Sequence, residues 1–183
     1  MDVVNALAET WPRRPALRRP FADVAREHLD DVYRYLVFLT ADPVLAEDLA
    51  GETFEKAFRS WKRFDPRRGS ERTWLCRLAR SKALDHFRSE ARRRRREDYS
   101  ASEAPPVDEP LADGLSPELE AALRSLSAGE REVVVLRIVL ELDALAAARV
   151  LGISRTACSM RLARALQKLE EMLEERMEAH VVA

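Results

Sequence analysis

A proline-rich acidic segment in the middle of the chain constrains the fold more than any other feature. Residues 97–117 read EDYSASEAPPVDEPLADGLSP and hold four of the nine prolines, with no hydrophobic period. A segment of this composition buries too little apolar surface to fold, so we expect a flexible linker. Helical periodicity lies on both sides of it, and no strand pattern is present. The sequence therefore predicts an all-α chain of two small helical domains joined by a flexible acidic linker.

The boundaries of the two domains follow from the same pattern. The 183 residues are 46% hydrophobic, enough for one or two small cores. We expect helical domains at 21–96 and 118–176, on either side of the linker. Residues 1–20, with three prolines and little periodicity, are predicted to be a disordered arm, and 177–183 a tail.

Charge is segregated along the chain although the formal net charge is only −1. Residues 21–53 carry eight acids against two bases, and residues 54–96 carry sixteen bases against five acids. Residues 97–118 then carry seven acids and no base. This alternation favours a nucleic-acid surface beside surfaces that meet other partners.

The stretch 64–88, FDPRRGSERTWLCRLARSKALDHFR, combines aromatic and cationic side chains on a predicted helix that follows a turn. Aromatic rings stack on unpaired bases and cations hold the phosphates of a single strand, so this mixture predicts a single-strand binding site. An amphipathic helix with a core Trp and a solvated basic face is the alternative. The side chains in question are Phe64, Trp74, Phe87, Arg67, Arg68, Arg72, Arg77, Arg80, Lys82 and Arg88.

Residues 143–169, DALAAARVLGISRTACSMRLARALQKL, predict a helix-turn-helix. Asp143 and Ser154 are expected caps, and Gly152 suits the left-handed position between the helices. Cys158, Leu162, Ala165 and Leu169 share an inward face, which leaves the basic side chains outward for a DNA groove. A plain helical hairpin with a basic stripe is the alternative.

Three blocks in this order resemble the bacterial ECF (extracytoplasmic-function) sigma factors of the sigma-70 superfamily. DPVLAEDLAGETFEKAFRSW is similar to the family's core-polymerase-binding helix, and the aromatic-basic stretch to its −10 segment. LSAGEREVVVLRIVLELDALAAARVLGISRTACSMRLARALQKLEEML is similar to its −35 domain. Relatives commonly carry Asn where this chain has Ser81 and Gln where it has Gly51.

The resemblance implies a sigma factor that binds core RNA polymerase, directs it to the −35 and −10 promoter elements and starts strand opening. The residues implied for polymerase binding are Asp48, Leu49, Glu52 and Phe54. Those implied for the −10 DNA are Phe64, Arg67, Arg68, Arg72, Trp74, Arg77, Arg80, Ser81 and Arg88. Those implied for the −35 DNA are Arg155, Ser159, Met160, Arg161, Ala163, Arg164 and Lys168.

The expected partners are core RNA polymerase and promoter DNA, and the resemblance adds an anti-sigma factor, since such proteins often restrain the family. A helix-turn-helix regulator that never joins polymerase is the alternative function, but it leaves the aromatic-basic helix unexplained. We predict no enzyme, cofactor or metal site, because no ligand cluster or nucleophile motif is present. Cys76 and Cys158 are expected to be buried thiols. Without a secretory signal or an apolar span, a cytoplasmic protein is expected.

Overall fold

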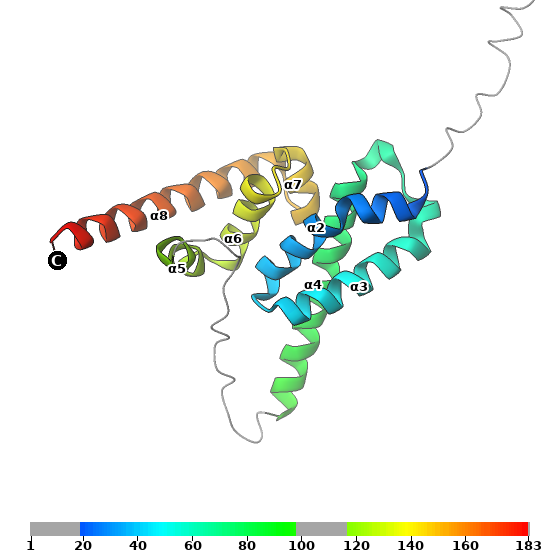
Figure 1. Cartoon of the computed structure of the whole chain (residues 1–183), viewed down its shortest axis with the longest axis horizontal. Coiled ribbons are helices and arrows are strands. Elements are labelled where there is room, and N and C mark those ends of the chain that lie inside the picture. Colours follow the sequence, from blue (N-terminus) through cyan, green and yellow to red (C-terminus); the bar gives the residue numbers. More distant parts are fainter. Residues whose placement is uncertain (1–18, 98–116, 183) are drawn as a thin grey trace, which may run out of the picture.

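The computed structural model describes residues 19–97 and 117–182. The expected linker, apart from its two end residues, and most of the expected arm lie outside the described residues. Throughout the described ranges the secondary structure is helical and no strand occurs (Figure 1). The predicted all-α class with two helical regions is confirmed.

Three helices build the N-terminal region and pack against one another (Figure 1). The second of them begins where the local chemistry favours a helix, because Asp42 accepts a hydrogen bond from the Leu45 amide at 3.0 Å and Pro43 occupies the first helical position. Their core contains Val32, Leu36 and Leu75. The elements are α2 (Phe21–Thr40), α3 (Pro43–Ser60), the 3-10 turns η1 (Trp61–Arg63) and η2 (Pro66–Arg68), and α4 (Glu71–Glu97).

The C-terminal region is a second helical unit, with α8 as its longest member (Figure 1). A capping box forms between Ser127 and Glu130, and Asp143, an expected cap, accepts hydrogen bonds from two amides at the start of α7. Gly152 has φ 69°, the left-handed conformation expected of it. The elements are α5 (Pro117–Ser125), α6 (Ala128–Val134), the π-helical turn η3 (Val135–Val139), α7 (Ala144–Leu151) and α8 (Arg155–Val182).

The apolar stretch over residues 133–140 is not one continuous α-helix. The π-helical turn η3 closes with a bond from the Leu140 amide to the Val135 carbonyl at 2.9 Å, five residues back. This wider turn changes the register, so Ile138 and Val139 are 53% and 39% exposed instead of joining the core. α8 also continues to Val182, beyond the expected domain end at residue 176.

The two regions touch each other. α4 packs against α7, and α2 packs against α6 and η3. A continuous set of buried hydrophobic residues runs through both regions. We call this arrangement closed, because the two helical regions are in contact. In it, the predicted helix-turn-helix lies against the predicted single-strand segment.

Candidate nucleic-acid interface

The aromatic residues of the predicted single-strand site pack on one another. The rings of Phe64 and Trp61 stack with centroids 5.1 Å apart and an interplanar angle of 9°, and Trp74 lies 5.2 Å from Phe64. Phe64 is only 7% exposed, whereas Trp74 is half-buried. Trp61 was not among the residues predicted for this site, and it joins the cluster from the η1 turn.

A small surface hollow, partly open to solvent, lies beside these rings. Its walls join aromatic and cationic groups, the combination that suits an unstacked nucleotide. Gly69 at its edge has φ 148°, a conformation that a residue with a side chain rarely adopts. The lining residues are Arg63, Phe64, Asp65, Arg68, Gly69, Thr73, Trp74, Arg77 and Arg149.

The cations of this segment divide by their surroundings. Arg67, Arg68 and Arg77 are exposed and so are accessible to phosphate. Arg88 is exposed too and lies 3.2 Å from Asp85, one turn earlier. Ser81 is half-buried on α4.

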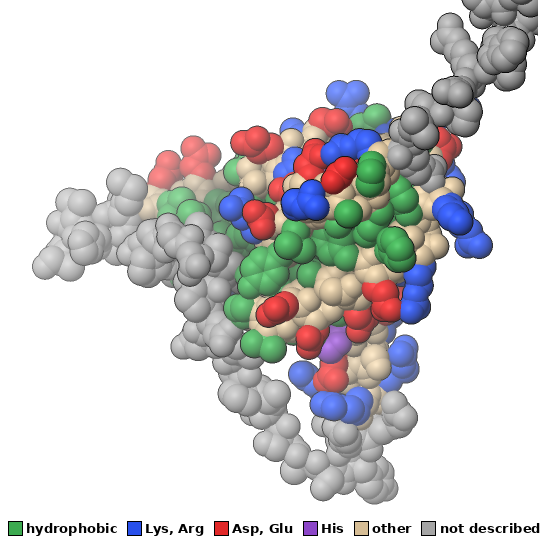
Figure 2. All heavy atoms as spheres, turned by 45° about the vertical axis from the view of Figure 1, so that its right-hand side comes forward, with side chains coloured by type: hydrophobic (Ala, Val, Ile, Leu, Met, Phe, Trp, Pro, Cys, Tyr) green, Lys and Arg blue, Asp and Glu red, His purple; other side chains and the backbone are tan. Residues whose placement is uncertain are grey.

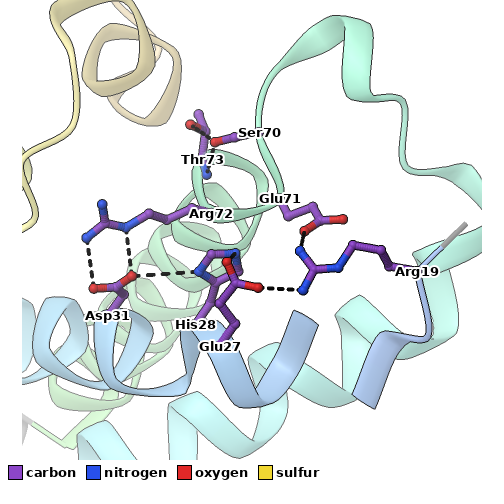
Figure 3. A network of polar contacts seen from close by, with 8 residues as sticks. All are labelled: Arg19, Glu27, His28, Asp31, Ser70, Glu71, Arg72 and Thr73. Carbon is purple, nitrogen blue, oxygen red and sulfur yellow. Dashed lines mark hydrogen bonds and ion pairs between the residues drawn. The ribbon is translucent and has the colours of Figure 1, made fainter. Parts of the chain in front are cut away.

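Arg72, in contrast, ties α4 to α2. It donates from Nη2 to Asp31 at 2.8 Å, and its Nε lies 2.7 Å from the other Asp31 oxygen (Figure 3). Arg19 makes a second tie between the same helices by pairing with Glu27 at 2.5 Å and with Glu71 at 3.2 Å (Figure 3). This network occupies the guanidinium of Arg72 within the protein.

Arg80 is also engaged, here by the C-terminal region. Its Nε donates to Glu132 of α6 at 2.7 Å and its Nη2 to the same carboxylate at 3.3 Å. Tyr35 of α2 donates its hydroxyl to Glu132 at 2.7 Å. Nothing in the local sequence signalled this contact, since Glu132 lies in an apolar helix far along the chain.

The acidic face predicted to bind polymerase lies on α3. Asp48 and Glu52 are exposed, and Glu52 accepts from Lys82 of α4 at 2.7 Å. Phe54 is half-buried and Leu49 is only 3% exposed, so Leu49 belongs to the core. Large apolar side chains exposed on the same helix are Val44 and Phe58, and in Figure 2 hydrophobic side chains gather across the middle of the visible face, with charged ones around them.

The predicted −35 residues follow the outer face of α8. Arg155, Ser159, Met160, Ala163 and Arg164 are exposed. The inward face is as predicted: Cys158, Ala165 and Leu169 are buried and Leu162 is half-buried.

Two cations of α8 have neighbours in their own region. Arg161 is half-buried and lies over Gly129, where an added Cβ would be 3.3 Å from its Nη1. Lys168 donates to Glu130 at 2.6 Å. The hydrogen bonds from Lys168 and Ser127 lower the pKa of Glu130 to about 2.

Two protein-family models match the chain, one in each helical region. The model described as Sigma-70 region 2 matches residues 24–93, and the model described as Sigma-70, region 4 matches residues 116–169. The first range contains the aromatic cluster and every lining residue of the hollow except Arg149, and the second contains the helix-turn-helix.

Similar curated proteins are named as RNA polymerase sigma factors. The ECF RNA polymerase sigma factor BldN of Streptomyces coelicolor is 30% identical over 84% of this chain and 60% of its own length. SigE of Mycolicibacterium smegmatis is 33% identical over 82% of this chain and 60% of its own length, so the chain spans about three fifths of these relatives. The probable RNA polymerase sigma-C factor of Mycobacterium bovis is 34% identical over 76% of this chain and 75% of its own length.

Solved structures share the fold. The sigma factor RpoE of Bartonella quintana, in complex with the anti-sigma factor NepR, has a TM-score of 0.71 at 24% identity and covers 84% of this chain and 96% of its own. CnrH in complex with the cytosolic domain of CnrY has a TM-score of 0.62 at 26% identity and covers 87% and 91%. Both family models and the curated relatives show that this chain belongs to the ECF RNA polymerase sigma factors of the sigma-70 superfamily.

Proposed function

We propose that the chain binds core RNA polymerase, directs it to −35 and −10 promoter elements and starts strand opening. The observation that supports this proposal is that the two helical regions present two different surfaces, each with the chemistry of a different form of nucleic acid. One is an aromatic-cationic hollow suited to a single strand, and the other is an exposed basic helix face suited to a duplex groove. A regulator that only binds duplex DNA has no use for the hollow.

Strand opening at the hollow needs no external energy source. Separating a base pair loses about 1.4 kcal/mol per stacked step, and capture of a base on an aromatic surface returns about 1–3 kcal/mol. Because Phe64 is covered by Trp61, a base enters beside the more open Trp74. We assign Arg67, Arg68 and Arg77 to the phosphates around it, with Ser81 and Arg88 further along α4.

Arg72 has a different part in this proposal. Its two contacts with Asp31 support a role in fixing the start of α4 on α2, which positions the hollow. Arg80 is withheld by Glu132 in the closed chain. Both residues were predicted to meet the −10 DNA directly, and that prediction stays open to test.

At the −35 element, α8 enters the major groove with its first half. Arg164 is exposed and is assigned to a base, with Ser159, Met160 and Ala163 beside it. Arg155, Arg161 and Lys168 are assigned to phosphates. A bidentate contact from Arg to guanine contributes about 1–3 kcal/mol of discrimination.

For polymerase binding we assign the exposed acids Asp48 and Glu52, together with the exposed apolar side chains Val44 and Phe58. Leu49 and Phe54 support α3 from the core side. The family also suggests an anti-sigma factor as a partner, as in the complex of RpoE with NepR.

The proposed role is not enzymatic, and its place is the cytoplasm, where polymerase and chromosome meet. The side chains that the structure describes contain no group of three His, Cys, Asp or Glu arranged for a metal ion. In the described ranges, every helix is too short or too polar to cross a membrane.

Reconstituted transcription tests the proposal. The chain is added to core polymerase on a library of genomic promoters, and we expect initiation from a defined subset. Core polymerase alone is the control. Initiation from none of the promoters would contradict the proposal, and DNA binding without core binding in a pull-down would favour the simple regulator.

A further inference from the structure

The contact between the two regions is centred on one acidic side chain, Glu132 of α6. It is 8% exposed and accepts hydrogen bonds from Tyr35 of α2 and Arg80 of α4. Within the described residues, these donors both belong to the N-terminal region. Glu132 is thus an acid of one region whose hydrogen bonds come from the other.

The chemistry of this cluster favours a firm contact in the closed state. Burial, together with the adjacent Glu132 charge, raises the pKa of the Tyr35 hydroxyl well above its usual range, so it remains a donor. Partial burial opposes the charge of Arg80, but the hydrogen bond and charge of Glu132 outweigh it and raise its pKa. Hydrogen bonds to an ionised acceptor are about twice as strong as neutral ones. A buried carboxylate that loses such donors is costly, which opposes partial opening.

A second contact covers the edge of the aromatic hollow. Arg149 of α7 lines it, and a Cβ added at Gly69 would lie 3.6 Å from the Arg149 Nη1. α7 is the first helix of the helix-turn-helix and packs against α4. The −35 unit therefore lies against the −10 surface.

This closed arrangement does not fit a promoter. The names −35 and −10 place the elements about 25 base pairs apart, which is roughly 85 Å of duplex at about 3.4 Å per pair. A compact body of this size has a radius of gyration of about 15 Å. With α4 in contact with α7, the two surfaces lie too close together to reach both elements.

We propose that Tyr35, Arg80 and Glu132 form a latch that holds the free protein closed. The latch has to open before both promoter elements are engaged. Arg80 then exchanges one anionic partner for another, from the Glu132 carboxylate to the DNA backbone. The closed state stands on the structure alone, whereas the need to open at a promoter and the transfer of Arg80 to DNA rest on the proposed function.

Small-angle X-ray scattering of the full chain tests the closed state. Glu132→Lys places a cation beside Arg80, and we expect its radius of gyration to shift upward from the wild-type value. Tyr35→Phe removes one hydroxyl and should give a smaller upward shift. Glu174→Lys, the same charge change at an exposed site on α8, is the matched control and should leave the radius unchanged.

A double variant separates opening from misfolding. Arg80→Glu combined with Glu132→Lys restores opposite charges across the contact, so we expect the radius to return toward the wild-type value. Circular dichroism checks that all variants keep their helix content. The latch is refuted if Glu132→Lys stays as compact as the control, or if the double variant is no more compact than Glu132→Lys.

A second experiment tests whether Glu132 keeps Arg80 from binding DNA, by measuring the affinity of the chain for a fluorescent mixed-sequence DNA single strand. Glu132→Lys should bind it several-fold more tightly than Glu174→Lys, which carries the same net charge. Equal affinities would overturn the transfer of Arg80. If scattering shows opening but wild-type chain and core polymerase initiate no transcription, the latch stands and the sigma function fails.

Discussion

Arg164 and Lys168 lie one turn apart on α8, but their surroundings differ. Arg164 is exposed, and its planar guanidinium matches the two acceptors of a guanine edge. Lys168 is held 2.6 Å from Glu130 and presents a point charge. The two residues should therefore contribute to DNA binding in different ways.

We predict that Arg164→Ala reduces discrimination among −35 sequences, by about 1–3 kcal/mol at one base position. Lys168→Ala should weaken binding evenly across sequences and lower the salt dependence. Fluorescence anisotropy with a −35 duplex and its single-base variants measures both effects. Equal loss of discrimination in the two variants would contradict the assignment.

Gly51 is a second site where a single residue affects a measurable property, here the stability of the fold. It is exposed in α3, and a Cβ added there meets nothing within 4 Å. We predict that Gly51→Ala raises the free energy of unfolding by about 0.5–1 kcal/mol, because Gly is entropically costly in a helix. Urea unfolding measures the change.

Gly152→Ala serves as the opposite control. Its φ of 69° is strained for a residue with a side chain, so the same substitution should lower the free energy of unfolding there by about 1–2 kcal/mol. A loss of stability in Gly51→Ala would show that α3 makes a contact at this position.

At the scale of elements, the helix-turn-helix depends on the cap that starts α7. Asp143 accepts from the amides of Leu145 at 2.7 Å and Ala146 at 2.8 Å. The hydrogen bond from the Ala146 amide is the largest cause that lowers the pKa of Asp143, and the bond from Leu145 adds to it. The cap is therefore an ionised carboxylate at neutral pH.

We predict that Asp143→Ala lowers the free energy of unfolding by about 1 kcal/mol, because two amides lose their acceptor. Asp30→Ala removes an exposed carboxylate of α2 and should change stability little. Denaturant unfolding compares the two variants. Similar losses would mean that the cap contributes no more than a surface charge.

The start of α6 adds a dependence on pH. Hydrogen bonds from Lys168 and Ser127 lower the pKa of Glu130 from 4.5 to about 2. A lowered pKa means that the carboxylate stabilises the fold above about pH 4.5 and that this contribution is lost as the pH falls toward about 2.

We predict that Glu130→Gln destabilises the chain at neutral pH and that its difference from wild type shrinks between pH 4.5 and 2. Urea midpoints of the two proteins over this range measure the effect. A difference that stays constant with pH would show that ionised Glu130 makes no such contribution.

Local chemistry explains which elements the sequence predicts. Caps such as Asp42, Ser127 and Asp143 bond to amides within three residues, so a short stretch of sequence is enough to recognise them. The π-helical turn η3 cannot be found in this way, because it depends on how residues 135–139 pack. Arg72 and Arg80 have acidic partners 41 and 52 positions away, so their engagement is invisible to any local pattern.

For the whole molecule, the sequence predicts two helical bodies and their order but not their closure. The charge segregation indicated separate surfaces for separate partners. In the structure some of these charges neutralise each other between helices, through Asp31 with Arg72 and Glu52 with Lys82. Because these charged side chains pair within the chain, fewer charges are available to external partners than the sequence suggests.

Cys76 of α4 and Cys158 of α8 are the two cysteines of the chain, and both are buried. Burial raises the pKa of Cys76 to about 12 and also raises that of Cys158, so neither is a reactive thiolate at neutral pH. A thiol reagent therefore modifies each one only when its own region opens. The chain therefore carries one natural thiol probe in each helical region, without any engineered label. The order in which Cys76 and Cys158 react reveals which region opens first.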